Sequence, residues 1–147
     1  MDMKKLKPEI AHDEGFVYEI YLDHLGYPTF GIGHLIVEGD PEFGQEVGTE
    51  VSAKRVSEQF DADLQVVIKE CEALYGEQWD DFPEEVQHVL CNMMFNLGRT
   101  RLAKFKNMRK AIDDENWATA AKEGRDSLWY KQVTNRAERL MTRLENV

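Results

Sequence analysis

The sequence predicts an α+β fold, mainly α, in which a small antiparallel sheet lobe and a helical lobe are joined by a long helix. Two observations predict it. Runs of β-branched and aromatic residues gather between residues 16 and 33 of the 147-residue chain. From residue 52 onward, apolar residues recur at spacings of three and four, which is the period of an amphipathic helix.

The N-terminal segment predicts a short helix. We expect it over residues 4–14, with Leu6 and Ile10 on its apolar side and Gly15 as a natural stop. Pro8 is awkward inside this helix unless it occupies the first turn, because proline has no N–H to donate.

A small antiparallel sheet is expected next. Its candidate strands are rich in β-branched and aromatic residues and cover residues 16–18, 20–22 and 29–33. A turn is expected at residues 23–26, before the last of them. The glycines Gly31 and Gly33 indicate close backbone packing better than they indicate phosphate binding. Residues 36–50 hold three glycines, one proline and five acids, so they are expected to form a loop or a weak hairpin.

Two long helices are predicted in the middle of the chain. The first runs from Ser52, a suitable cap, to about residue 74. The second follows the acidic stretch 80–85, whose charges suit the positive end of a helix dipole, and Gly98 is expected to end it. Its apolar stripe is Val86, Val89, Leu90, Met93, Met94 and Leu97.

Shorter helices are expected around residues 101–112 and 116–124. A last helix is expected from Asn135, with Glu138 at the capping-box position. We therefore expect a single domain, with a cleft between its two lobes. Its parts would be a sheet lobe over about 15–51, a connecting helix over about 52–74 and a helical lobe over about 75–147, with helix 4–14 packed on the helical lobe.

The net charge of −10, from 28 acidic and 18 basic residues, argues against a general nucleic-acid binder and against adhesion to anionic membranes. The charge is unevenly spread. Residues 1–97 carry 21 acidic and 6 basic side chains, whereas residues 98–147 carry 7 acidic and 12 basic ones. No stretch approaches the roughly 20 apolar residues of a membrane span.

Little in the sequence points to a metal or a cofactor. The four histidines lack the spacing of metal ligands, and neither a P-loop nor a G-x-S-x-G motif occurs, so no cofactor is expected. Cys71 and Cys91 fall at apolar helix positions, where buried free thiols are expected.

Two carboxylates stand at places where chemistry is possible. Glu14 ends the first predicted helix and Asp23 lies at a turn, and both would border an open cleft if the sheet folds back against the helix end. Paired carboxyl groups can perform acid–base catalysis. Since about one residue in five is acidic, this pair alone is better explained as two solvated charges.

The surrounding residues favour catalysis. Residues 14–35, which include Asp23, Thr29 and the run GIGHL, resemble without a gap the active-site segment of phage-type lysozymes, glycoside hydrolase family 24. Residues 92–98 and 127–137 resemble two further segments of these enzymes, especially those of the T-even phages. Three matching segments in the same order argue against coincidence.

The resemblance implies a two-lobe, lysozyme-like fold and a cofactor-free muramidase that cleaves β-1,4 bonds between N-acetylmuramic acid and N-acetylglucosamine. Glu14 would be the general acid that protonates the glycosidic oxygen. Asp23 would orient the attacking water, and Thr29 would help to hold it. The family also implies inversion, for which the two carboxyl groups stand roughly 6.5–9.5 Å apart to admit a water.

Other family positions carry over to this chain. Arg136 would pair with Glu14, and Gln132 would brace the same corner. Leu35 and Phe95 match apolar positions that line the saccharide groove, although core packing is an alternative role for both.

The chain also departs from the family. Near the groove, Met108 replaces a small hydroxyl residue and Glu123 replaces an asparagine, so neither contact is assured. The resemblance still implies a structural ion pair between His34 and Asp63 that joins the sheet to the long helix, with two unpaired surface groups as the alternative. The segment between Thr29 and Ser52 is about ten residues shorter than in the T-even enzymes, and the usual tryptophan-containing tail is missing.

Two functions stay open at this point. One is an endolysin, an active muramidase whose partner is bacterial peptidoglycan, with a chitin-like polymer as an alternative substrate. The other is a non-catalytic or weakly active module that binds peptidoglycan or a partner protein in a phage particle. As an endolysin, the protein would be a monomer made in the host cytoplasm without a signal peptide or stable membrane insertion. It would reach the periplasm and cell wall after holin-dependent release.

Overall fold

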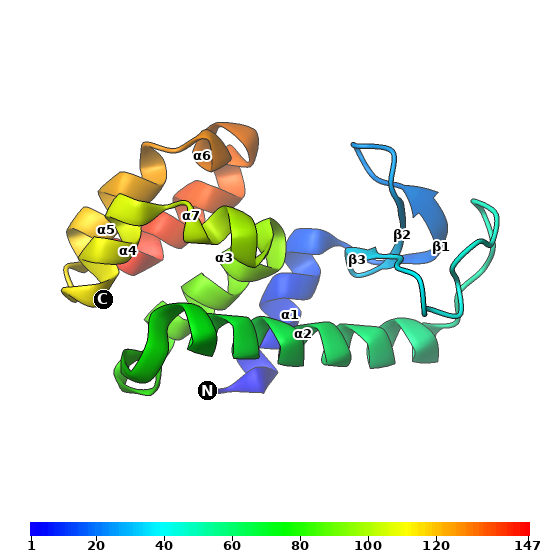
Figure 1. Cartoon of the computed structure of the whole chain (residues 1–147), viewed down its shortest axis with the longest axis horizontal. Helices are drawn as coiled ribbons and strands as arrows, with labels where there is room; N and C mark the ends of the chain where they lie inside the picture. Colours follow the sequence, from blue (N-terminus) through cyan, green and yellow to red (C-terminus); the bar gives the residue numbers. More distant parts are fainter. The chain divides into compact units, whose positions relative to one another are not determined.

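The computed structural model describes residues Met1–Val147 and confirms the α+β, mainly α fold (Figure 1). The elements follow in this order: α1 (Met3–Glu14), β1 (Val17–Leu22), β2 (Pro28–Gly31), β3 (His34–Leu35), α2 (Ala53–Tyr75), the 3-10 helix η1 (Gly76–Asp81), α3 (Glu84–Ala103), α4 (Lys106–Asp113), α5 (Trp117–Arg125), α6 (Leu128–Gln132) and α7 (Thr134–Glu145). No helix is both long enough and apolar enough to cross a membrane.

The chain divides into two compact units. The sheet unit is Lys7–Val66, and the helical unit is Met1–Leu6 together with Val67–Val147. Helices α1 and α2 each contribute residues to both units, because the boundaries fall inside them.

The sheet of the sheet unit has three antiparallel strands in the order β1-β2-β3. Thr29 on β2 lies opposite Tyr21 on β1 and opposite Leu35 on β3. The core of this region is a cluster of four buried side chains: Ile20, Phe30, Val51 and Val56. Gly31 confirms the expected close backbone packing, since a Cβ atom there would lie 3.1 Å from the Val56 side chain.

Helix boundaries follow the local signals in most places. Ser52 caps α2 as predicted, because its Oγ accepts a hydrogen bond of 3.1 Å from the Arg55 N–H. Gly98 interrupts α3 with a φ of 77° and a ψ of 163°, but a further helical turn follows it, so it breaks the helix and does not end it. Pro8 lies inside α1 beyond its first turn, where it leaves one backbone hydrogen bond unmade.

The helical unit is built around α7. Helix α5 packs against both α4 and α7, and α3 and α6 also contact α7. Cys71 and Cys91 are fully buried free thiols, as predicted. A hydrogen bond to Cys91 and burial together raise the pKa of the Cys71 thiol well above its usual value.

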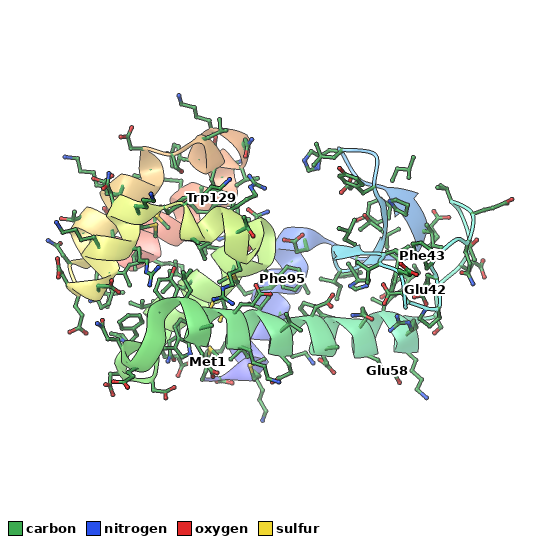
Figure 2. The ribbon with its side chains drawn as sticks, viewed as in Figure 1. Met1, Glu42, Phe43, Glu58, Phe95 and Trp129 are labelled. Atoms are coloured by element: carbon green, nitrogen blue, oxygen red, sulfur yellow. The ribbon has the colours of Figure 1, made fainter.

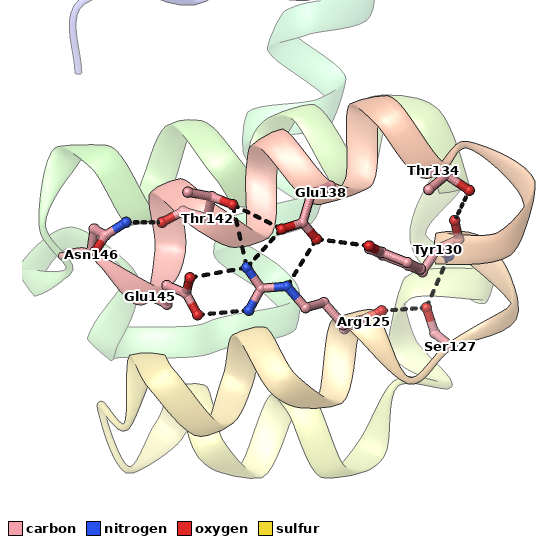
Figure 3. A network of polar contacts seen from close by, with 9 residues as sticks. Arg125, Ser127, Tyr130, Thr134, Glu138, Thr142, Glu145 and Asn146 are labelled. Atoms are coloured by element: carbon pink, nitrogen blue, oxygen red, sulfur yellow. Dashed lines mark hydrogen bonds and ion pairs between the residues drawn. The ribbon is translucent and has the colours of Figure 1, made fainter.

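The predicted capping box at Glu138 is wrong. Helix α7 begins at Thr134 without any side-chain cap, and Glu138 makes other contacts (Figure 3). Its carboxylate accepts hydrogen bonds from Arg125 at 3.0 Å and from the Tyr130 hydroxyl at 2.8 Å. A guanidinium is a stronger donor than a single backbone N–H, and Arg125 lowers the pKa of Glu138 to about 2.

Candidate active site

Glu14 is the last residue of α1. The helix stops there because Gly15 adopts a φ of 72°, while its N–H still donates to the Ala11 carbonyl at 2.9 Å. The chain then turns directly into β1. Glu14 is half-buried, so its carboxyl group is held at the junction of helix and sheet and remains reachable from solvent.

Asp23 is fixed by the turn that joins β1 to β2. Its Oδ1 accepts two backbone hydrogen bonds, from Leu25 at 2.9 Å and from Tyr27 at 2.8 Å. The turn closes because the Gly26 N–H donates to the Asp23 carbonyl, and Gly26 supplies the positive φ of 85°. Its Oδ2 accepts no hydrogen bond from the protein, so one carboxylate oxygen is anchored and the other is available to a water molecule.

Thr29 is buried on β2, with 4% of its surface exposed. Its hydroxyl donates to the Tyr27 carbonyl at 2.9 Å. A hydroxyl that donates its one hydrogen in this way retains lone pairs that can accept a hydrogen bond from water.

Tyr21 lies near the carboxyl groups of Glu14 and Asp23. Burial raises the pKa of Tyr21, and the negative charges of Glu14 and Asp23 raise it further. Tyr21 also lies directly opposite Thr29 in the sheet. The sheet unit therefore brings three predicted catalytic residues, Glu14, Asp23 and Thr29, around one tyrosine.

Several exposed apolar side chains lie near this group along the chain or in the sheet. Leu22 and Tyr27 flank Asp23 along the chain and are 53% and 54% exposed, and Leu25 lies between them in the turn at 68%. Leu35, next to Thr29 in the sheet, is 48% exposed, so core packing is not its role. Exposed apolar side chains concentrated in one segment are typical of an interaction site.

The predicted pair of His34 and Asp63 is confirmed, and it links β3 to α2. His34 Nδ1 lies 2.8 Å from Asp63 Oδ2, and Nε2 lies 2.8 Å from Asp40 Oδ2, a second partner in the loop after β3. Burial alone would lower the pKa of His34, but hydrogen bonds to Asp63 and Asp40 outweigh it and raise the pKa. We call His34, Asp40 and Asp63 the histidine clamp.

A second contact holds the same loop to α2. Arg55 donates two hydrogen bonds to the buried Glu42, at 2.9 and 3.0 Å, and stacks over Phe30 at 5.3 Å. Figure 2 labels Glu42 in this loop beside the exposed Phe43. The loop between the sheet and α2 is thus irregular in backbone but fixed by charged side chains.

The helical unit holds the remaining predicted site residues on different helices. Arg136 Nε on α7 donates to Asn92 Oδ1 on α3 at 2.8 Å. Gln132, at the end of α6, accepts a hydrogen bond of 3.2 Å from Arg101, and Phe95 is half-buried on α3. Because Glu14 belongs to the sheet unit, its pairing with Arg136 stays a prediction.

The two helical segments of the family resemblance contact each other. Besides the Asn92–Arg136 bond, the Trp129 indole N–H donates to Asn96 Oδ1 at 2.7 Å. Residues 92–98 and 127–137 thus form one packed corner of the helical unit.

The two substituted positions differ in accessibility. Met108 is 2% exposed in the core beneath α5, so it offers no surface to a glycan. Glu123 is half-buried and lines a polar pocket of about 290 Å³ with residues of α4, α5 and their connection. No group of three or more His, Cys, Asp or Glu side chains could hold a metal ion.

Comparison with known proteins decides the family. The sequence profile described as phage lysozyme matches residues 11–146, which is most of the chain. The chain belongs to the phage lysozyme family. Members of this family are lysozyme-type glycoside hydrolases.

Relatives of this phage lysozyme differ greatly in length. The pre-baseplate central spike protein Gp5 of Enterobacteria phage T4 is 35% identical across 89% of the chain, and the chain spans only 26% of that protein. A probable T4-type lysozyme of Dictyostelium discoideum is 29% identical, with 97% of the chain and 95% of the relative aligned. The peptidoglycan hydrolase gp36 of Pseudomonas phage phiKMV is 29% identical across 97% of the chain and 15% of its own length.

Sequence reasoning missed three residues that contact, or pair in the sheet with, the residues it singled out. Asn92 is fully buried and holds Arg136, and its signal is an amide on an otherwise apolar helix face. Tyr21 had a readable signal too, since it lies two residues before Asp23 on a strand. Asp40 carried no signal, because nothing in a loop of five acids distinguishes the one that reaches His34.

Proposed function

We propose that this phage lysozyme hydrolyses the β-1,4 bond between N-acetylmuramic acid and N-acetylglucosamine in bacterial peptidoglycan. Its family and its peptidoglycan hydrolase relative support peptidoglycan as the substrate class. The observation that carries the proposal is the grouping of Glu14, Asp23 and Thr29 around Tyr21.

In the proposed reaction, Glu14 gives its proton to the glycosidic oxygen as the bond from that oxygen to the anomeric carbon breaks. A water molecule attacks the anomeric carbon and passes a proton to Asp23. The two backbone hydrogen bonds on Oδ1 support this role, since they leave Oδ2 for the water. The Thr29 hydroxyl can accept a hydrogen bond from the same water.

The proposed role of Glu14 is tested by Glu14→Gln, with turbidity loss of outer-membrane-permeabilised bacteria as the readout. A general acid contributes about 10²- to 10⁴-fold, so clearing should slow by at least that lower factor. Glu19→Gln is the matched control, because it removes the same charge from an exposed position on β1. Equal clearing by wild type and Glu14→Gln would contradict the proposal.

Product analysis tests the bond and the stereochemistry. A muramidase leaves a reducing N-acetylmuramic acid end, which mass spectrometry of the released fragments identifies. Inversion predicts that the α-anomer appears first in proton NMR of the fresh product. A reducing N-acetylglucosamine end would overturn the proposed bond specificity.

A second candidate is a wall-binding module of a phage particle with little turnover. The relative named as a central spike protein supports it, whereas the relatives named as lysozymes, aligned over 95% of their length, support a free enzyme. In the free-enzyme role we propose a monomer that reaches the wall after holin-dependent release. Wild-type protein that binds peptidoglycan but releases no reducing ends would favour the module.

A further inference from the structure

Tyr21 lies at the centre of the candidate active site but has no part in the proposed proton transfers. It is half-buried on β1, opposite Thr29 and two residues before Asp23. Its side chain also lies within the electrostatic field of Glu14 and Asp23.

The Tyr21 hydroxyl makes no hydrogen bond within the protein. Its environment consists of partial burial and two nearby negative charges. Tyr130 is a useful contrast, because its hydroxyl donates to Glu138 at 2.8 Å as part of a structural network (Figure 3). The Tyr21 hydroxyl is not fully buried, so it is open to water and can donate its hydrogen to an acceptor that arrives from outside.

The neighbouring side chains leave one role unfilled. A sugar presents many acceptor oxygens, yet Asp23 only accepts and Thr29 already donates its hydrogen to the Tyr27 carbonyl. The proton of Glu14 is used in the reaction itself. Tyr21 is therefore the remaining neutral side-chain donor in this group, and burial, together with the charges of Glu14 and Asp23, raises its pKa and keeps it protonated.

We propose that the Tyr21 hydroxyl donates a hydrogen bond to an oxygen of the sugar at the bond that Glu14 and Asp23 cleave. The inference rests on the proposed function, since it assumes that the sugar binds there. It makes Tyr21 a substrate-contacting residue and predicts that its hydroxyl, separate from its ring, contributes to catalysis.

The test compares Tyr21→Phe with Tyr18→Phe. Both remove one hydroxyl from β1, and Tyr18 is an exposed residue outside the proposed machinery. On a soluble peptidoglycan fragment, Tyr21→Phe should lower kcat/KM by about ten- to thirtyfold, the worth of one hydrogen bond to a polar ligand. Tyr18→Phe should stay within twofold of wild type. The midpoint of thermal unfolding should be the same in all three proteins, because no protein hydrogen bond is lost.

A spectroscopic measurement separates contact with the sugar from a structural effect. In Glu14→Gln protein labelled with ¹³C at the tyrosine ζ carbon, a tetrasaccharide of alternating N-acetylglucosamine and N-acetylmuramic acid should shift the Tyr21 signal. The Tyr18 signal should stay in place.

The outcomes distinguish the two proposals. Wild-type protein that releases no reducing ends would refute the proposed function itself. If the wild type is active, any one of three results would refute the Tyr21 inference. These are an unchanged kcat/KM in Tyr21→Phe, a loss of activity that follows a lowered unfolding midpoint, and a Tyr21 signal that the tetrasaccharide does not shift.

Discussion

The two units of the molecule are charged and stabilised in different ways. The sheet unit carries 13 acidic and 3 basic side chains, a net charge of −10, whereas the helical unit carries 15 of each. The whole net charge of the protein therefore belongs to Lys7–Val66. Ten of the thirteen exposed large hydrophobic side chains belong to the same segment.

The difference shows where this protein exposes its apolar and acidic groups. The sheet unit displays apolar and acidic groups to solvent, and its long loop is secured by the histidine clamp and by the pair of Arg55 and Glu42. The helical unit buries its apolar groups under packed helices. We therefore expect the sheet unit to respond to pH and salt, and the helical unit to respond mainly to changes in packing.

The largest expected effect is from Phe30→Ala in the sheet unit. Phe30 is fully buried, contacts the His34 ring edge-on at 5.1 Å and lies under Arg55. Its truncation should lower the free energy of unfolding by about 3–5 kcal/mol, because a cavity forms and the histidine clamp and the Arg55–Glu42 pair lose their support. Chemical denaturation measures this loss, and hydrogen exchange should show opening concentrated in residues 7–66.

Phe82→Ala is the matched control in the helical unit. Phe82 is 5% exposed and packs against Tyr75, Trp79 and Trp117. Its truncation should open the exchange of residues 67–147 and leave the sheet unit protected. Identical exchange patterns in the two variants would mean that the chain opens as one cooperative body, contrary to this comparison.

A smaller effect, dependent on pH, is expected from His34→Gln. Because the folded pKa of His34 is raised above 6.5, the clamp contributes fully below pH 6.5 and is lost as pH rises through the folded value. Burial opposes ionisation of Asp40, but the Val37 N–H and His34 lower its pKa below 3.8, so its contribution is lost as pH falls through that lower value.

Denaturant unfolding at two pH values measures the clamp. His34→Gln should cost about 2 kcal/mol near pH 5.5, where His34 is charged, and clearly less near pH 9. His12→Gln, an exposed histidine on α1, should cost little at either pH. A cost for His34→Gln that is the same at both pH values would show that the ring contributes by packing alone.

The smallest expected effect is that of salt. Self-repulsion among the acids of the sheet unit should weaken as the Debye length falls to roughly 3 Å at 1 M salt. Hydrogen exchange in residues 7–66 should slow by about two- to threefold, with little change in residues 67–147. If hydrogen exchange slowed equally in both units, the effect would come from a general strengthening of apolar burial by salt and not from weaker repulsion among the acids.

Most of the fold could be predicted because local chemistry determines it. Ser52 caps α2, and Gly15 and Gly98 stop or break helices at the expected places. The start of α7 could not be predicted in this way. Glu138 satisfied the capping pattern, but Arg125, thirteen residues away in the chain, provides stronger hydrogen bonds.

The candidate site could be proposed from the sequence for a different reason. Glu14, Asp23 and Thr29 lie within one short segment, where a helix end, a turn and a strand pair fix their positions. Contacts between distant segments were out of reach for periodicity alone. Nothing local to Asn92 or Arg136 indicates that they meet across 44 residues of chain.

The two cysteines allow the opening of the helical unit to be measured by thiol labelling. Cys71 and Cys91 are both fully buried, and the sheet unit contains no cysteine. A thiol reagent such as dithionitrobenzoate can therefore react only after the helical unit opens, and the yellow thionitrobenzoate released counts those openings. The raised pKa of Cys71 suppresses its thiolate in the closed state, so background labelling is low. The rate of labelling therefore measures the opening of the helical unit alone.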